Sequence, residues 1–297
     1  MRLLFFLCFL LTAGFRSDRP AYQLFTQTGK ATSFDKLARD AAKADVVLFG
    51  ELHNNPICHW LQVQLMQELV QARGKQLVLG AEMFEADNQK ALSGYVSGQL
   101  SAKEFAQQAR LWPNYNTDYR PVVDLAREQK LPFIATNVPR RFASLVARQG
   151  LPALDTLSAA DKRQMASLPL TVDLTLPGYK GMLDMMGTHG GQASAGTSAQ
   201  ANGAAENFAR AQALKDATMA RFILENWKPG QTFLHLNGDY HSKNFEGIVW
   251  YLRQQKPDLN IVTISSVEAE AILKAKPDWK GLATYILAIP ADMTKTY

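Results

Sequence analysis

Short, continuously apolar runs recur along the chain and are separated by segments with helical periodicity. The predicted strands cover residues 45–49, 76–82, 132–137, 232–237, 260–265 and 284–289. Strands that are apolar at every position, rather than at alternate positions, are typical of a parallel sheet buried on both faces. We therefore predict an α/β fold with a mainly parallel sheet flanked by helices.

Two of the predicted helices have clear start signals. Asn55 can cap a helix whose first residue is Pro56, and apolar residues then recur every four positions from Ile57 to Leu69. The segment SAKE at 101–104 has the spacing of a capping box, in which a serine and a glutamate satisfy each other's backbone N–H groups. These signals place helices after the first and second predicted strands.

The rhythm of the pattern changes between residues 151 and 206. This stretch holds three prolines, the methionine-rich piece GMLDMMGTHGG and the small-residue tract QASAGTSAQANGAA. The tract lacks the side chains needed to build a core. We predict an inserted helical and loop lobe over 151–206, between the two parts of the α/β core at 22–150 and 207–297.

Residues 1–21 are predicted to be a signal peptide. Arg2 precedes an eleven-residue apolar stretch, which is shorter than the roughly 20 residues that span a bilayer and typical of a secretory signal. Cleavage would remove Cys8 and leave Cys58 without an intramolecular partner. Because Cys8 precedes a full apolar run, we do not expect a lipid anchor, and we interpret the chain as exported.

Composition and charge narrow the class of ligand. The chain is 47% hydrophobic, which is ample for a core, and its formal net charge is +5, of which the predicted signal contributes +2. No run of lysines and arginines and no RNA-type aromatic signature stands out, so nucleic acid is not an expected partner.

Polar residues follow four of the predicted strands at their carboxyl ends. They are Glu51 and His53, Glu82 and Glu85, Asn137 and Arg140, and Asp239 and His241. In open α/β sheets the loops converge at this edge, and ligands bind there. The sequence therefore predicts one cleft built from four strand ends.

The phrase G-[ED]-x-H occurs twice, at 50–53 and 238–241. In extended chain the acid and the histidine of each phrase point the same way, and the glycine lets the backbone pass close to a ligand. His53, His241 and Asp239 are the candidate ligands of a divalent transition metal, and the same groups are suited to acid–base work on a bound water. In the alternative interpretation the acids cap helices and the histidines are buried hydrogen-bonding groups.

A second set of candidates lies in the predicted lobe. Tyr179 and His189 stand on either side of Met182, Met185 and Met186. A phenol and an imidazole among soft apolar side chains are suited to haem, since tyrosine and histidine are haem ligands and methionine adapts to irregular surfaces. In the alternative interpretation this segment is a lid whose methionines pack on the core.

The other histidines and three aromatic residues have less specific surroundings. His235 lies in the middle of a predicted strand and His59 in an early helical turn, so we expect structural roles for both. Trp112, Tyr115 and Tyr119 precede a predicted helix, where they either wall the cleft or belong to the core.

Five motifs follow one another in an order that points to a known family. They are FGELHNN, LGAEMFE, the W-P-x-Y-x-x-D-Y-R-P segment at 112–121, PFIATNVPRR and LHLNGDYHSKN. In this order they resemble the ChaN-like haem-binding uptake proteins of the Tiki superfamily, over roughly residues 31 to 290.

The resemblance implies a haem-binding protein that assists iron uptake in the bacterial cell envelope, in the periplasm or at the outer-membrane periphery. It also implies a homodimer with haem between the protomers, a tyrosine as axial ligand, and an outer-membrane haem-uptake receptor as partner. For this chain we select Tyr179 as the ligand and His189 as the second candidate, with Met185 beside them. Arg140 or Arg141 would meet a propionate.

The resemblance further implies kinship with metal-dependent proteases and esterase-like proteins, in which paired G-x-x-H motifs and a glutamate form the active site. The alternative function is therefore a metal-dependent hydrolase, with His53 and His241 as metal ligands and Glu51 or Glu82 activating water. The sequence leaves open whether the chain is an enzyme.

Overall fold

The structure is a computed structural model that describes residues 19–189 and 198–297. The predicted signal peptide, apart from its last three residues, lies outside this part of the chain, as do the first six residues of the small-residue tract. Within the two described ranges, no helix combines the length and the apolar character needed to cross a membrane.

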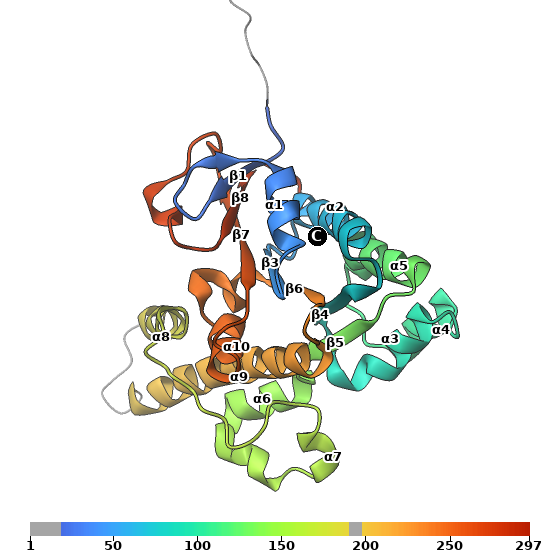
Figure 1. Cartoon of the computed structure of the whole chain (residues 1–297). Helices are drawn as coiled ribbons and strands as arrows, with labels where there is room; N and C mark the ends of the chain where they lie inside the picture. Colours follow the sequence, from blue (N-terminus) through green and yellow to red (C-terminus); the bar gives the residue numbers. More distant parts are fainter. Residues whose placement is uncertain (1–18, 190–197) are drawn as a thin grey trace, which may run out of the picture.

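Within the described residues, a single sheet of eight strands forms the centre of the molecule (Figure 1). In spatial order the strands are β2 (Ala31–Thr32), β1 (Gln23–Thr26), β8 (Tyr285–Pro290), β7 (Ile261–Ala269), β3 (Val46–Glu51), β6 (Thr232–Gly238), β4 (Leu77–Glu85) and β5 (Phe133–Asn137). The six strands from β8 to β5 pair in parallel, whereas β1 pairs antiparallel with β8 and with β2. The predicted α/β class and mainly parallel sheet are confirmed, and the antiparallel edge at β1 and β2 was not predicted.

Helices cover both faces of the sheet. They are α1 (Phe34–Ala41), α2 (Pro56–Arg73), α3 (Gln89–Val96), α4 (Ala102–Gln108), α5 (Arg120–Gln129), α6 (Arg140–Gln149), α7 (Ala159–Lys162), α8 (Pro177–His189), α9 (Ser198–Asn226) and α10 (Ile248–Gln255). Val47 and Phe49 of β3 pack in a core with α1, α2, α3 and α5, whereas Val46 and Leu48 pack in a core with α9 and α10. Because successive residues of a strand point to opposite faces, a strand between two cores must be apolar at every position.

The predicted helix starts are confirmed. The Asn55 side chain accepts a hydrogen bond from the Ile57 N–H at 3.0 Å, and Pro56 is the first residue of α2. Ser101 and Glu104 form the predicted capping box at the start of α4. Each signal satisfies backbone N–H groups that a helix leaves unpaired in its first turn.

The segment predicted as an inserted lobe packs on α9. Phe142 and Val146 of α6 share a small core with Leu154, Met165 and Leu214. The predicted boundary at residues 206 and 207 falls inside α9, which is one continuous helix. This helix therefore joins the inserted segment to the layer that covers the sheet.

Candidate functional site

A cleft of about 1340 Å³ lies beyond the carboxyl ends of β3, β4, β5 and β6. All eight strand-end residues that the sequence marked line this cleft, namely Glu51, His53, Glu82, Glu85, Asn137, Arg140, Asp239 and His241. They come together because neighbouring parallel strands end at the same edge of the sheet. Their convergence is confirmed, and their roles stay predictions.

The first motif pairs a buried carboxylate with a partly exposed imidazole at the cleft floor. The Nδ1 of His53 lies 2.8 Å from Oε1 of Glu51, and the Tyr119 hydroxyl donates to the same oxygen at 2.7 Å. Gln62 of α2 donates to the other oxygen of Glu51. Burial alone would raise the pKa of Glu51, but the hydrogen bond from His53 and the nearby imidazoles outweigh it and hold the pKa below its usual range.

The second motif forms a pair with a carboxylate on each side. The Nε2 of His241 lies 3.1 Å from Oε1 of Glu82, and its Nδ1 lies 2.5 Å from Oδ1 of Asp216 on α9. Burial would lower the pKa of His241, but the carboxylates of Glu82 and Asp216 outweigh it and raise the pKa to about 10. At neutral pH both ring nitrogens therefore carry protons and donate.

Gly238 brings the two pairs together. Its N–H donates to Oε2 of Glu82 at 2.8 Å, and a Cβ added at this position would lie 2.7 Å from Nε2 of His53. The imidazole of the first motif thus packs against the glycine of the second, where no other residue leaves room. The alternative in which the acids of both motifs cap helices does not hold for Glu51, whose contacts are to side chains.

Asp239 forms no hydrogen bond or ion pair with His53 or His241 in the described part of the chain. Its Oδ1 accepts from the Ser266 N–H at 3.2 Å, and burial raises its pKa to about 6. Within the described part of the chain, no group of three or more His, Cys, Asp or Glu side chains is arranged to hold a metal ion. The structure therefore does not assemble His53, His241 and Asp239 as a ligand set, and the metal-dependent hydrolase stays a prediction.

The lobe candidates are in different places. Tyr179 is only 4% exposed, and its hydroxyl donates to Oδ2 of Asp216 at 2.6 Å, so it does not line the cleft. Burial and the Asp216 carboxylate raise the pKa of this phenol well above its usual range. Met185 and Arg140 do line the cleft. His189 is the last residue of α8, and its side chain lies outside the described residues.

The three aromatic candidates divide between wall and core. Trp112 lines the cleft, and its ring centre lies 5.0 Å from that of His53. Tyr119 lies below it and supports Glu51, whereas Tyr115 packs against Phe84 in the core. Both alternatives stated for this segment are therefore present in the same stretch of chain.

Sequence reasoning did not single out two residues of the site. Tyr240 is 55% exposed in the cleft, and the Lys243 ammonium lies 3.6 Å from its ring centre. The feature of the sequence that could have identified Tyr240 is its position between the acid and the histidine of GDYH. Asp216 is a buried acid on α9 next to Ala217, and a charge beside buried alanines was the signal that pointed to it.

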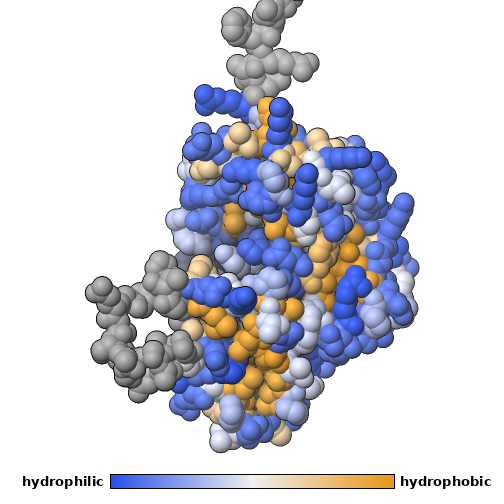
Figure 2. Space-filling view, turned by 90° about the vertical axis from the view of Figure 1, so that its left-hand side faces the viewer, coloured by the Kyte–Doolittle hydropathy of each residue, from blue (hydrophilic) through white to orange (hydrophobic). Residues whose placement is uncertain are grey.

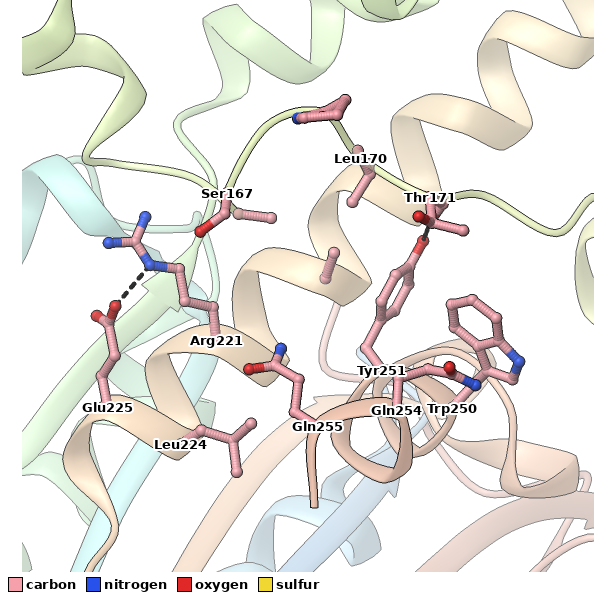
Figure 3. Close-up of a pocket in the computed structure, with 13 residues that line it drawn as sticks. Ser167, Leu170, Thr171, Arg221, Leu224, Glu225, Trp250, Tyr251, Gln254 and Gln255 are labelled. Atoms are coloured by element: carbon pink, nitrogen blue, oxygen red, sulfur yellow. Dashed lines mark hydrogen bonds and ion pairs between the residues drawn. The ribbon is translucent and has the colours of Figure 1, made fainter. Parts of the chain in front are cut away.

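A second, smaller pocket of about 390 Å³ lies between α9, α10 and the segment at 166–171 (Figure 3). Figure 3 shows the ion pair of Arg221 with Glu225 on one side, and the Tyr251 hydroxyl donating to the Thr171 carbonyl on the other. None of the residues marked by the sequence line this pocket.

Comparisons with known proteins agree with the architecture. The family model for haem-binding uptake proteins, ChaN, of the Tiki superfamily matches residues 37–252. A solved structure of ChaN from Campylobacter jejuni, described as showing cofacial haem binding, has a TM-score of 0.67 and 19% identity, and the match covers 91% of this chain and 97% of that one. A Bacillus cereus protein has a TM-score of 0.50 and 12% identity, over 91% of this chain and 95% of its own. No curated protein matches the sequence.

Proposed function

Because this chain belongs to the haem-binding uptake family of the Tiki superfamily, the ChaN family, we propose that it binds haem in the cleft at the strand ends. We propose further that the bound haem serves iron uptake in the cell envelope. The observation that carries the proposal is the surface of the cleft, which places exposed apolar side chains beside cations that form no ion pair with another described residue.

The apolar part of this surface suits a flat macrocycle. Among the described residues, the large apolar side chains exposed in the cleft are Met185, Phe208, Tyr240 and Tyr297. Exposed apolar side chains that gather in one place mark a binding surface. Figure 2 shows apolar side chains gathered on the lower part of one face of the molecule.

The charged part of the surface suits two propionates. The cations of the cleft are Arg140, Lys215, Lys243 and Lys276. None of them forms an ion pair with another described residue, whereas Glu85 and Glu268 of the same cleft are already paired with Arg110 and Lys295. Two further acids of the cleft, Asp239 and Asp278, form no ion pair with a described residue. The four cations outnumber them, which favours an anionic ligand.

We propose Tyr240 as the axial ligand in place of Tyr179. A tyrosine oxygen is a known ligand of haem iron, and Tyr240 presents its ring to the cleft. Tyr179 is buried and donates its proton to Asp216. Bound haem would supply the iron centre, while the chain supplies a phenol, an apolar bed and cations for the propionates.

The remaining parts of the function rest on the family and on the N-terminal sequence. We propose export through residues 1–21, a location in the periplasm or at the outer-membrane periphery, and a homodimer with haem between protomers. An outer-membrane haem-uptake receptor is the proposed partner.

Titration of the purified protein with haemin tests the proposal. We expect a Soret band that saturates, and a shifted band with at least about ten-fold weaker binding in Tyr240→Phe, because the iron loses its oxygen ligand. Tyr297→Phe is the matched control, since it removes another exposed phenol of the cleft and should leave the spectrum unchanged. A parent protein that gives no Soret change would overturn haem binding, and an unaltered Tyr240→Phe spectrum would overturn the ligand.

A further inference from the structure

We propose that Tyr179 and Asp216 are positioning residues that hold α8 against the cleft by fixing it to the cleft floor. This inference rests on the proposed function, because α8 supplies part of the surface on which haem would lie. It gives Tyr179 a role that differs from iron ligation.

A chain of hydrogen bonds connects the helix to the floor. The Tyr179 hydroxyl donates to Asp216 at 2.6 Å, and the other oxygen of Asp216 lies 2.5 Å from Nδ1 of His241. The Nε2 of His241 lies 3.1 Å from Glu82, which in turn accepts from the Gly238 N–H at 2.8 Å. The chain thus passes from α8 through α9 to the ends of β6 and β4.

The other attachments of α8 lie around the same buried tyrosine and at the first turn of the helix. Figure 1 shows this helix at the edge of the molecule, beside α9 and outside the layers that cover the sheet. Tyr179 packs with Ala209 and Ala213 of α9, and five partly buried residues surround them, namely Val172, Leu174, Leu176, Met182 and Leu183. A further polar attachment is at its first turn, where the Gly178 N–H donates to Glu246 at 2.6 Å. Among the described side chains of α8, Tyr179 is the one that is buried, so its ring and its bond to Asp216 fix the helix at a single point.

The same helix forms part of the cleft. Met182 and Met185 of α8 line it, and they follow Tyr179 by about one and two helical turns. A movement of α8 would therefore displace both methionines from the cleft. Haem held between these methionines and the floor would dissociate faster when the helix is loose.

Because this chain of hydrogen bonds is buried, the loss of one donor or acceptor atom should weaken it. Tyr179, Asp216 and His241 are all buried, so water does not replace a lost partner. Removing the phenol oxygen leaves one oxygen of Asp216 without its donor, and a buried unsatisfied acceptor is costly. We expect α8 to detach more often in response.

Hydrogen exchange of the haem-free, full-length protein is the first test. In Tyr179→Phe and in Asp216→Asn, amides within 177–189 should exchange about ten-fold faster than in the parent. Tyr285→Phe is the matched control, because it removes a similar bond, from the Tyr285 hydroxyl to Asp40 at 2.5 Å, on the opposite side of the sheet. Unchanged exchange of α8 in both cleft variants would overturn the proposal.

Haem transfer to an excess of apomyoglobin is the second test. Tyr179→Phe should release haem about ten-fold faster while the Soret maximum stays where the parent has it. A shifted maximum would identify Tyr179 as an iron ligand and overturn its positioning role. If the parent binds no haem, the proposed function fails, and the hydrogen exchange still decides whether Tyr179 holds α8.

Discussion

His53 and His241 stand in the same motif but have different electrostatic surroundings. His241 lies between two buried carboxylates, so its proton is held at neutral pH. His53 has one carboxylate partner, and its side chain is 34% exposed. The two copies of the motif therefore differ: His241 is fixed between carboxylates at the floor of the cleft, whereas His53 is accessible to a ligand.

A third histidine, His235, has a pKa that predicts how stability depends on pH. Burial lowers the pKa of His235 to about 4, and its ring is bonded to Thr136 and Asn237 inside the sheet. The unfolded chain binds this proton near the ordinary pKa of about 6.5. Between these two values the unfolded state holds more protons, so the stability that neutral His235 provides is present above pH of about 6.5 and is lost as the pH falls toward 4.

We expect this residue alone to reduce the free energy of unfolding by about 3 kcal/mol between pH of about 7.5 and 4. Urea unfolding of the parent and of His235→Gln at several pH values measures it, and the variant should lose less stability on acidification. Asp239 acts in the opposite direction, since its raised pKa favours the folded state at low pH. Because Asp239 is present in both proteins, the difference between them isolates His235, and identical slopes would contradict the expectation.

At the scale of elements, α2 connects a local start signal to the cleft floor. Asn55 caps the helix and also donates to Glu268 of β7 at 2.8 Å. From the same helix, Gln62 donates to Glu51, and His59 lies 3.1 Å from the His53 carbonyl. The helix start therefore sets the positions of the groups that support the Glu51–His53 pair.

Asn55→Ala should lower the free energy of unfolding by about 2 kcal/mol, because a buried cap and its bond to β7 are both lost. Ser101→Ala is the comparison, since it removes an exposed cap at the start of α4 and should cost about 1 kcal/mol. Denaturant unfolding measures both variants. Equal losses would show that the contact between Asn55 and Glu268 adds nothing to the cap.

At the scale of the whole molecule, the distribution of charge favours an anionic ligand in the cleft. Glu85 and Glu268 at its edge are paired with Arg110 and Lys295. Within the described residues, four unpaired cations then stand against two unpaired acids, Asp239 and Asp278. The formal net charge of +5 adds only a weak general attraction.

Haem affinity should therefore fall as ionic strength rises, and Lys276→Glu should weaken binding about five-fold through loss of an attraction and gain of a repulsion. Lys256→Glu is the control, because Lys256 follows α10, is exposed and does not line the cleft. Haemin titrations at low and high sodium chloride measure both effects. Equal affinities for the two variants would contradict a role for cleft cations.

The strands and the residues at their carboxyl ends could be predicted from the sequence, because the patterns that mark them involve only neighbouring residues. Continuous apolar runs indicated buried parallel strands, and the residues after them indicated the cleft, since parallel strands end at a common edge. The edge strands β1 and β2 gave no comparable signal. Strand β2 has only two residues, and β1 has four and pairs with β8, which is distant in sequence.

The sequence by itself determined the fold class, the helix starts and the convergence of both G-[ED]-x-H motifs. Tertiary structure alone decided which carboxylate meets which imidazole: Asp216 reaches His241 from α9, and Tyr179 is turned into the interior while Tyr240 remains exposed. The physical reason is that periodicity and caps depend on neighbours within a few residues. A hydrogen bond between distant residues depends on how whole helices pack.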